Sequence, residues 1–211
     1  MFFQLRRAIL SAMDIPGLKK YVEELFRTRL PESFTYHNWD HTLAVWRAVV
    51  EFAAYSGITD AGAVELEAAA LFHDTGYFYG EHRGHEKRSA GLAGKLLPGF
   101  GMAPEAVARV RRLIEATVFP CRPRTLEEEI ICDADIEYQG RGGYDEVSAK
   151  LREELASQGR SFDDGEWRRF QDGFLSRVRF FSPAGRALRQ PGLERLREAR
   201  GIKFIPGGFN A

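Results

Sequence analysis

The chain has 211 residues, of which 44% are hydrophobic and 28% are charged, a balance typical of a globular protein with a substantial core. Lys and Arg together number 30 and Asp and Glu together number 30, so the formal net charge is zero. A chain without net charge has no overall basic field that would favour nucleic acid or an anionic membrane. We therefore expect no nucleic-acid partner.

Cysteine content and the N-terminal sequence bear on the compartment. Cys121 and Cys132 are too few for a disulfide framework and do not form a CxxC pair. The N-terminal stretch MFFQLRRAIL carries charges inside its apolar run and lacks a cleavage site, and no stretch approaches the roughly 18 apolar residues of a membrane span. We expect a cytoplasmic protein with reduced thiols and no membrane partner. Its oligomeric state cannot be read from the sequence.

Apolar residues recur at spacings of three and four along most of the chain, while the alternation typical of strands is scarce. A helix is expected over residues 3–12, and another after Pro16. LPESFTYHN contains turn-forming residues and predicts a loop. Asn38 then suits the N-cap of a long helix that runs to about Tyr55.

Turn signals separate the helices that follow. SGITDAG precedes AVELEAAALFHD, a segment of strong helix formers that is expected to end near Gly76. GYFYGEHRG predicts an irregular loop. Further helices are expected over Glu86 to Leu97 and over residues 104–117, 126–139, 144–157, 163–180 and 191–199.

These elements predict an all-α fold built by packing helix on helix. We interpret residues 1–211 as a single domain. Its core, at about residues 30–140, holds every motif described below, and helices at about 144–200 pack on that core. SQGRSFDDG is interpreted as a loop and not as a domain boundary.

Residues that can bind a metal gather in this core. His41 lies near the start of one predicted helix, His73 and Asp74 close a second, and DAD at 133–135 lies in a third. Helical bundles build metal sites from inward-facing side chains on separate helices. Imidazole and carboxylate together suit a divalent ion of borderline to hard character, and two of each leave positions open for water and substrate.

The ordered set His41, His73–Asp74 and Asp135 resembles the HD-domain superfamily of metal-dependent phosphohydrolases. YHNWDHT at 36–42 resembles the YHNxxH stretch of cyclic-nucleotide phosphodiesterases and of many small bacterial HD hydrolases. HDTGY at 73–77 is a common form of the central doublet, and HEKRSA at 85–90 resembles the HExxSA segment of bacterial HD proteins. The resemblance covers about residues 30–140.

This resemblance implies a cofactor and a reaction. The cofactor is a divalent ion, which could be Mn, Mg, Fe, Co, Ni or Zn, and it activates a water that attacks phosphorus. The substrate is a small-molecule phosphate ester, expected to be a nucleotide-type monoester or diester. The implied metal ligands are His41, His73, Asp74 and Asp135.

Further roles follow from the same resemblance. Asp74 is also expected to be catalytic, because it can bridge to a second ion. His37 matches the phosphodiesterase histidine that protonates the leaving oxygen. His85 is expected to lie near the position of a second metal or to contact the substrate phosphate. Arg88 is expected to contact that phosphate, whereas His82 is interpreted as a loop residue.

Asp133 competes with Asp135 for the fourth ligand position. Residues two apart on a helix point about 200° apart, so only one of them can face the ion easily. The fourth ligand of the family usually follows a small residue in an AD pair, which favours Asp135.

Two other functions stay open. The domain could be a non-catalytic ligand-sensing module that kept the fold, or a metal enzyme of another class, such as an oxygenase or a lyase. The intact ligand set argues against the first. No histidine follows His85, which argues against an oxygenase.

Overall fold

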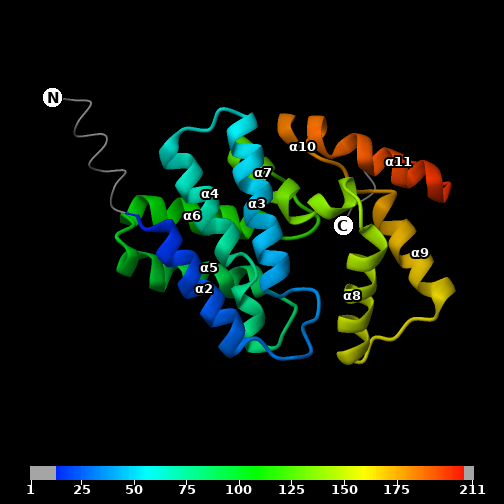
Figure 1. Ribbon diagram of the computed structural model, residues 1–211, viewed down its shortest axis with the longest axis horizontal. Helices are drawn as coiled ribbons and strands as arrows, with labels where there is room; N and C mark the ends of the chain where they lie inside the picture. The colour runs from blue at the N-terminus through cyan, green and yellow to red at the C-terminus, as the bar shows by residue number, and fades with distance from the viewer. Residues whose placement is uncertain (1–12, 207–211) are drawn as a thin grey trace.

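A computed structural model describes residues 13–206, and within that range the chain forms helices and no strand (Figure 1). The predicted all-α fold class is therefore confirmed. The helix expected over residues 3–12 lies outside the described residues. No helix between residues 13 and 206 is both long and apolar enough to cross a lipid bilayer.

Six α-helices form the larger group of elements, on the left of Figure 1. Their bounds are α2 Ile15–Arg29, α3 Trp39–Tyr55, α4 Asp60–Phe72, α5 His85–Leu96, α6 Pro104–Ala116 and α7 Leu126–Asp135. Helix α4 lies at their centre and packs against α2, α3, α5, α6 and α7. Its last five residues, AAALF at 68–72, are fully buried. A helix end that is apolar on all sides is expected to be buried, and its alanines let the neighbouring helices approach closely.

Four further helices form the right side of Figure 1: α8 Tyr144–Ser157, α9 Asp164–Leu175, α10 Pro183–Leu188 and α11 Gln190–Arg200. Helix α10 packs on α3 and α7, and α11 packs on α10 and α9. A smaller apolar cluster lies beneath these helices, formed by Tyr36, Tyr138, Tyr144, Leu175, Val178, Phe180 and Leu193. The division into a core at 30–140 and packed C-terminal helices stays a prediction.

Three predicted helices are shorter in the structure than expected. The helix expected to end near Gly76 ends at Phe72. The helix predicted over 126–139 ends at Asp135, and a 3₁₀ turn, η3, covers Glu137–Gly140. The helix predicted over 163–180 ends at Leu175, and α10 begins separately at Pro183. Two more 3₁₀ helices, η1 at Thr75–Tyr79 and η2 at Leu97–Phe100, follow α4 and α5. Apolar spacing does not distinguish a short 3₁₀ turn from the α-helix that precedes it.

Candidate metal centre

Helix α3 begins as the sequence predicts, and its cap positions the first histidine. The side chain of Asn38 accepts hydrogen bonds from the backbone N–H groups of Asp40 and His41, at 2.9 and 3.2 Å. These two donors belong to the first turn of the helix, where no carbonyl within the helix can satisfy them. His41 is therefore held in the first turn of α3, and only 8% of its side chain is exposed.

The doublet lies where α4 ends. His73 is the C-cap residue of α4, and Asp74 already leaves the helical conformation, with φ −105° and ψ 2°. Neighbouring residues on a continuing helix point about 100° apart. The change of backbone at Asp74 lets both side chains approach one point, with Asp74 Oδ2 3.2 Å from His73 Nε2. His73 Nδ1 donates to the carbonyl oxygen of Ala70 at 2.8 Å, which leaves Nε2 free to face the site.

The glycine of HDTG, Gly76, lies where η1 and α5 approach each other closely. A Cβ at this position would lie 2.0 Å from the carbonyl oxygen of His85, so only glycine allows η1 to approach the start of α5 this closely. Gly76 N–H donates to Ser89 Oγ at 2.7 Å, and Arg88 Nε donates to the Gly76 carbonyl at 3.1 Å. The contact brings His85 Nε2 to 3.5 Å from Asp74 Oδ1.

Four ligand atoms converge at the resulting site. His41 Nε2 lies 3.4 Å from His73 Nε2, 3.4 Å from Asp74 Oδ2 and 3.2 Å from Asp135 Oδ1. His73 Nε2 lies 3.5 Å from Asp135 Oδ1. The structure thus brings together the four residues that were predicted as metal ligands. Their role as ligands stays a prediction.

The residues present fit a divalent cation. Metal–ligand bonds of about 2.1 Å place neighbouring ligand atoms about 3.0–3.4 Å apart, close to the observed spacings. Asp74 Oδ2 is buried, and no group in the described part of the chain donates a hydrogen bond to it. A buried carboxylate oxygen without a partner is costly, and a bound cation would satisfy it.

The charges of these groups support one another. Burial raises the pKa of Asp74, but His73 and then His85 outweigh burial and hold that pKa well below its usual range. Burial lowers the pKa of His73, but the two carboxylates outweigh it and raise that pKa well above its usual value. For Asp135, the hydrogen bonds from the histidines likewise outweigh burial and lower the pKa. Both carboxylates are therefore ionised at neutral pH.

Asp133 turns away from this centre. Its Oδ1 accepts from Phe181 N–H, and its Oδ2 accepts from the N–H and hydroxyl of Ser182, all three at 2.7 Å. Burial raises the pKa of Asp133 to about 6 despite these bonds. Gly185 permits the close approach, because a Cβ there would lie 2.3 Å from Asp133 Oδ2. Of the two aspartates in DAD, only Asp135 contacts His41 and His73.

His37 has a partner that the sequence did not reveal. Glu154 of α8 is fully buried, and its Oε1 lies 2.5 Å from His37 Nδ1. Glu154 Oε2 accepts from the backbone N–H groups of Tyr36 and His37, at 2.8 and 2.9 Å. Burial raises the pKa of Glu154, but the bonds from His37 and Tyr36 outweigh it and lower that pKa. Glu154 follows Leu151 by three residues on α8, so both lie on one face of the helix. A glutamate on a face with apolar residues was the sequence signal that could have indicated its burial.

The remaining predicted residues lie at the edge of the centre. The His85 ring stacks on Tyr77 with 4.1 Å between ring centres. Both residues line a cavity of about 800 Å³, together with Arg83 and Lys87. Arg88 donates to the carbonyl oxygens of Gly76, Arg83 and Glu81, so its guanidinium holds the loop before α5. A contact between Arg88 and substrate stays a prediction.

Comparison with known proteins agrees with this geometry. The family model described as "HD domain" matches residues 38–137, which include all four candidate ligands. This segment of the chain is similar to an HD domain. The crystal structure of Bacillus subtilis YpgQ in complex with ADP shares its fold, with a TM-score of 0.60 over 89% of this chain and 95% of that chain, at 18% identity. No curated protein shows significant sequence similarity to the chain.

The HD domain gives the candidate centre a general chemical context. HD domains form a superfamily of metal-dependent phosphohydrolases, and His41, His73 and Asp74 form a cluster here that could hold a metal ion. Their ligand atoms all lie within 4.8 Å of one another. The shared fold with YpgQ extends past residue 137, so the C-terminal helices belong to the same architecture.

Proposed function

We propose that the chain is a phosphohydrolase that uses a divalent cation to hydrolyse a nucleotide-type phosphate monoester or diester. The observation that carries the proposal is the convergence of two imidazole nitrogens and two carboxylate oxygens, one of which is buried without a hydrogen-bond donor. Apolar side chains could stabilise the fold at this position without the free-energy cost of burying charged groups, so the cluster favours a functional role.

The ligands we assign to the cation are His41, His73, Asp74 and Asp135. A divalent cation supplies Lewis acidity, which lowers the pKa of water and offsets charge on a phosphoryl oxygen. The protein's own contribution is to fix the ligands before substrate arrives. Asn38 holds His41, and the Ala70 carbonyl fixes the His73 ring.

His37 is the proposed proton donor to the leaving oxygen. Its ring centre lies 5.9 Å from that of His41 and 6.5 Å from that of His85, so it borders the metal centre without belonging to it. Since Glu154 holds Nδ1, Nε2 is the ring nitrogen that can exchange a proton with substrate. Glu154 acts as a positioning residue for this step.

The cavity beside His85 is the proposed place for the substrate. Arg83 and Lys87 give it cationic side chains, and Tyr77 gives it an aromatic wall. Cations bind phosphate oxygens, and an aromatic face can pack against a base. The structure of YpgQ with ADP supports a nucleotide as the class of substrate. His85 and Arg88 are the residues we assign to phosphate contact.

The test combines metal analysis with a search for activity. Purified protein is analysed for bound metal and then screened for phosphate release from nucleoside mono-, di-, tri- and cyclic phosphates with Mn²⁺, Mg²⁺, Co²⁺ or Ni²⁺ added. We expect a bound cation and hydrolysis of at least one nucleotide. Asp135→Asn should lose the cation of this centre and the activity, because it removes an anionic ligand while keeping the size of the side chain.

Asp40→Asn is the matched control. Asp40 lies next to His41 in α3, but its side chain is exposed and is not among the four ligands. This variant should keep both metal and activity. A metal-loaded protein that hydrolyses nothing in the panel would refute the proposal and favour the ligand-sensing alternative. Hydrolysis that persists after complete removal of metal would refute the role of the cation.

A further inference from the structure

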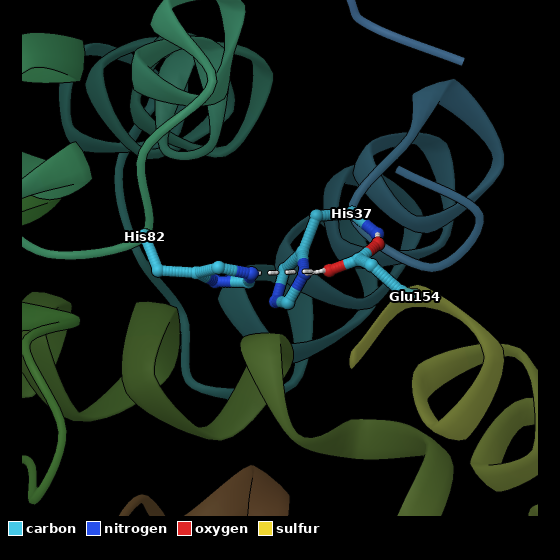
Figure 2. A group of neighbouring side chains, drawn as sticks. All are labelled: His37, His82 and Glu154. Atoms are coloured by element: carbon cyan, nitrogen blue, oxygen red, sulfur yellow. Dashed lines mark hydrogen bonds and ion pairs between the residues drawn. The ribbon is translucent and has the colours of Figure 1, made fainter. Parts of the chain in front are cut away.

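A second group of metal-ligating side chains lies next to the candidate centre and shares no residue with it. His37 comes from the loop before α3, His82 from the loop between η1 and α5, and Glu154 from α8. One ligand atom from each lies within 4.8 Å of the other two. Figure 2 shows His82 and Glu154 pointing toward one another from opposite sides, with the His37 ring between them.

One atom of this group lacks a partner. His82 Nε2 is buried, lies 3.8 Å from Glu154 Oε1 and makes no hydrogen bond with any described residue, although the side chain of Gln158 lies near the ring. An imidazole nitrogen that is removed from water without a bond is costly. The same nitrogen faces a buried carboxylate, so a cation placed between them would satisfy both groups.

The protonation of His82 and of Glu154 suits metal binding. Burial, and then the neighbouring His37, lower the pKa of His82, so its ring is neutral and offers a lone pair. Glu154 is ionised, and its Oε2 is occupied by two backbone N–H groups, so Oε1, which now bonds to His37 Nδ1, is the oxygen that would bind a cation. The available donors are thus two imidazole nitrogens and one carboxylate oxygen.

We propose that His37, His82 and Glu154 bind a second cation of the borderline transition-metal class, with Zn²⁺ as the best match. Two histidines and one glutamate are a recognised ligand set for zinc that keeps a coordination position open. Magnesium and calcium prefer oxygen ligands, so a set with two nitrogens disfavours them. His82 lines the 800 Å³ cavity, through which an ion can enter.

Binding at this second site has a chemical consequence. A cation there would take the Oε1 and Nδ1 atoms that now share one hydrogen bond, so the proton between them would have to leave Nδ1. The effect on activity rests on the proposed function. If His37 donates from Nε2, a cation on Nδ1 keeps the ring out of the doubly protonated form, which is the stronger acid, and excess Zn²⁺ slows hydrolysis.

Metal counting tests the site without reference to activity. The full chain is titrated with Zn²⁺, and bound metal is measured by elemental analysis after desalting. The wild-type protein should hold about two ions per chain, and His82→Ala and His82→Asn about one. Arg83→Ala, a change at the next residue of the same loop, should still hold about two. Equal counts in the wild-type and both His82 variants would overturn the proposal.

A complementary variant separates the two sites. Asp135→Asn should lose the first ion and keep the second, and Asp135→Asn combined with His82→Ala should hold none. An Asp135→Asn variant that holds no ion would contradict a separate second site.

The outcomes distinguish failure of this inference from failure of the proposed function. A wild-type protein that hydrolyses nucleotides but holds a single ion overturns the second site alone. A protein that holds two ions and loses one in His82→Ala, yet hydrolyses nothing, refutes the proposed function and leaves the second site standing. If the second site and the proposed function are both correct, excess Zn²⁺ lowers the hydrolysis rate of the wild-type protein several-fold. The hydrolysis rate of His82→Ala is then the same with and without excess Zn²⁺.

Discussion

Asp133 and Asp135 are two residues apart in α7 but have different partners, and this difference gives a sharp prediction. Asp133 is fully buried and accepts three hydrogen bonds from Phe181 and Ser182. Asp135 is 26% exposed and contacts the histidines of the candidate centre. Replacing Asp133 should therefore lower the stability of the fold, whereas replacing Asp135 should remove metal.

The size of the Asp133→Ala effect follows from these contacts. Two backbone N–H groups lose their acceptor, and each buried unpaired donor costs about 1–3 kcal/mol. The free energy of unfolding should fall by about 2–6 kcal/mol, which corresponds to a melting temperature lower by about 4–24 °C for a domain of this size. Asp133→Asn keeps one acceptor oxygen but turns its amide NH₂ group toward a donor, so its loss of stability should be intermediate.

The assay is thermal and urea unfolding followed by circular dichroism at pH 8, combined with metal analysis of each folded variant. This pH lies above the value of about 6 to which burial raises the pKa of Asp133, so the carboxylate is ionised. Asp135→Ala is the companion variant, and it should lose metal with a smaller loss of stability. Two results would contradict these roles: a free energy of unfolding for Asp133→Ala within about 1 kcal/mol of the wild-type value, or loss of metal from Asp133→Ala while Asp135→Ala retains it.

Three further predictions concern the centre and its supports. Glu154→Gln removes the anion that holds His37 Nδ1, so kcat should fall by about 10²-fold, while the metal count at Asp135 and its partners is kept; an unchanged kcat would exclude the positioning role. Gly76→Ala places a methyl group against the His85 carbonyl, so unfolding experiments should show a loss of about 1–3 kcal/mol, and wild-type stability would contradict the close approach. With free metal at 100 times its Kd, removal of the metal by a chelator should lower the free energy of unfolding by about 2.7 kcal/mol, or Tm by about 5–11 °C. A similar shift in the Asp135→Asn variant would argue against Asp135 as a ligand.

Helix positions could be predicted from the sequence wherever a local signal exists. Asn38 marks the start of α3 because its side chain satisfies two N–H groups of the first turn. The helix predicted over 144–157 agrees with α8. The stop at Leu175 and the separate α10 were missed, because apolar spacing continues across that break.

Tertiary contacts set the limit of prediction at the site. The ligand types and their order suggested that His41, His73, Asp74 and Asp135 meet, and the structure brings them together. Glu154 was missed because its partner lies 117 positions earlier in the chain. The local sequence of α8 shows only a charged residue near apolar ones, which does not distinguish a buried glutamate from a solvated one.

The C-terminal helices are part of the candidate active site and not an addition to it. Glu154 of α8 clamps the backbone at Tyr36 and His37, just before α3 begins. Asp133 of α7, in turn, holds the segment that leads into α10. The HD-domain match ends at residue 137, before Glu154 and before the segment that leads into α10. A chain that stopped there would still encode the four proposed ligands but would lose the group that positions His37. Metal binding at the candidate centre should therefore need only the HD segment. Turnover should also need α8, because Glu154 positions the proton donor His37.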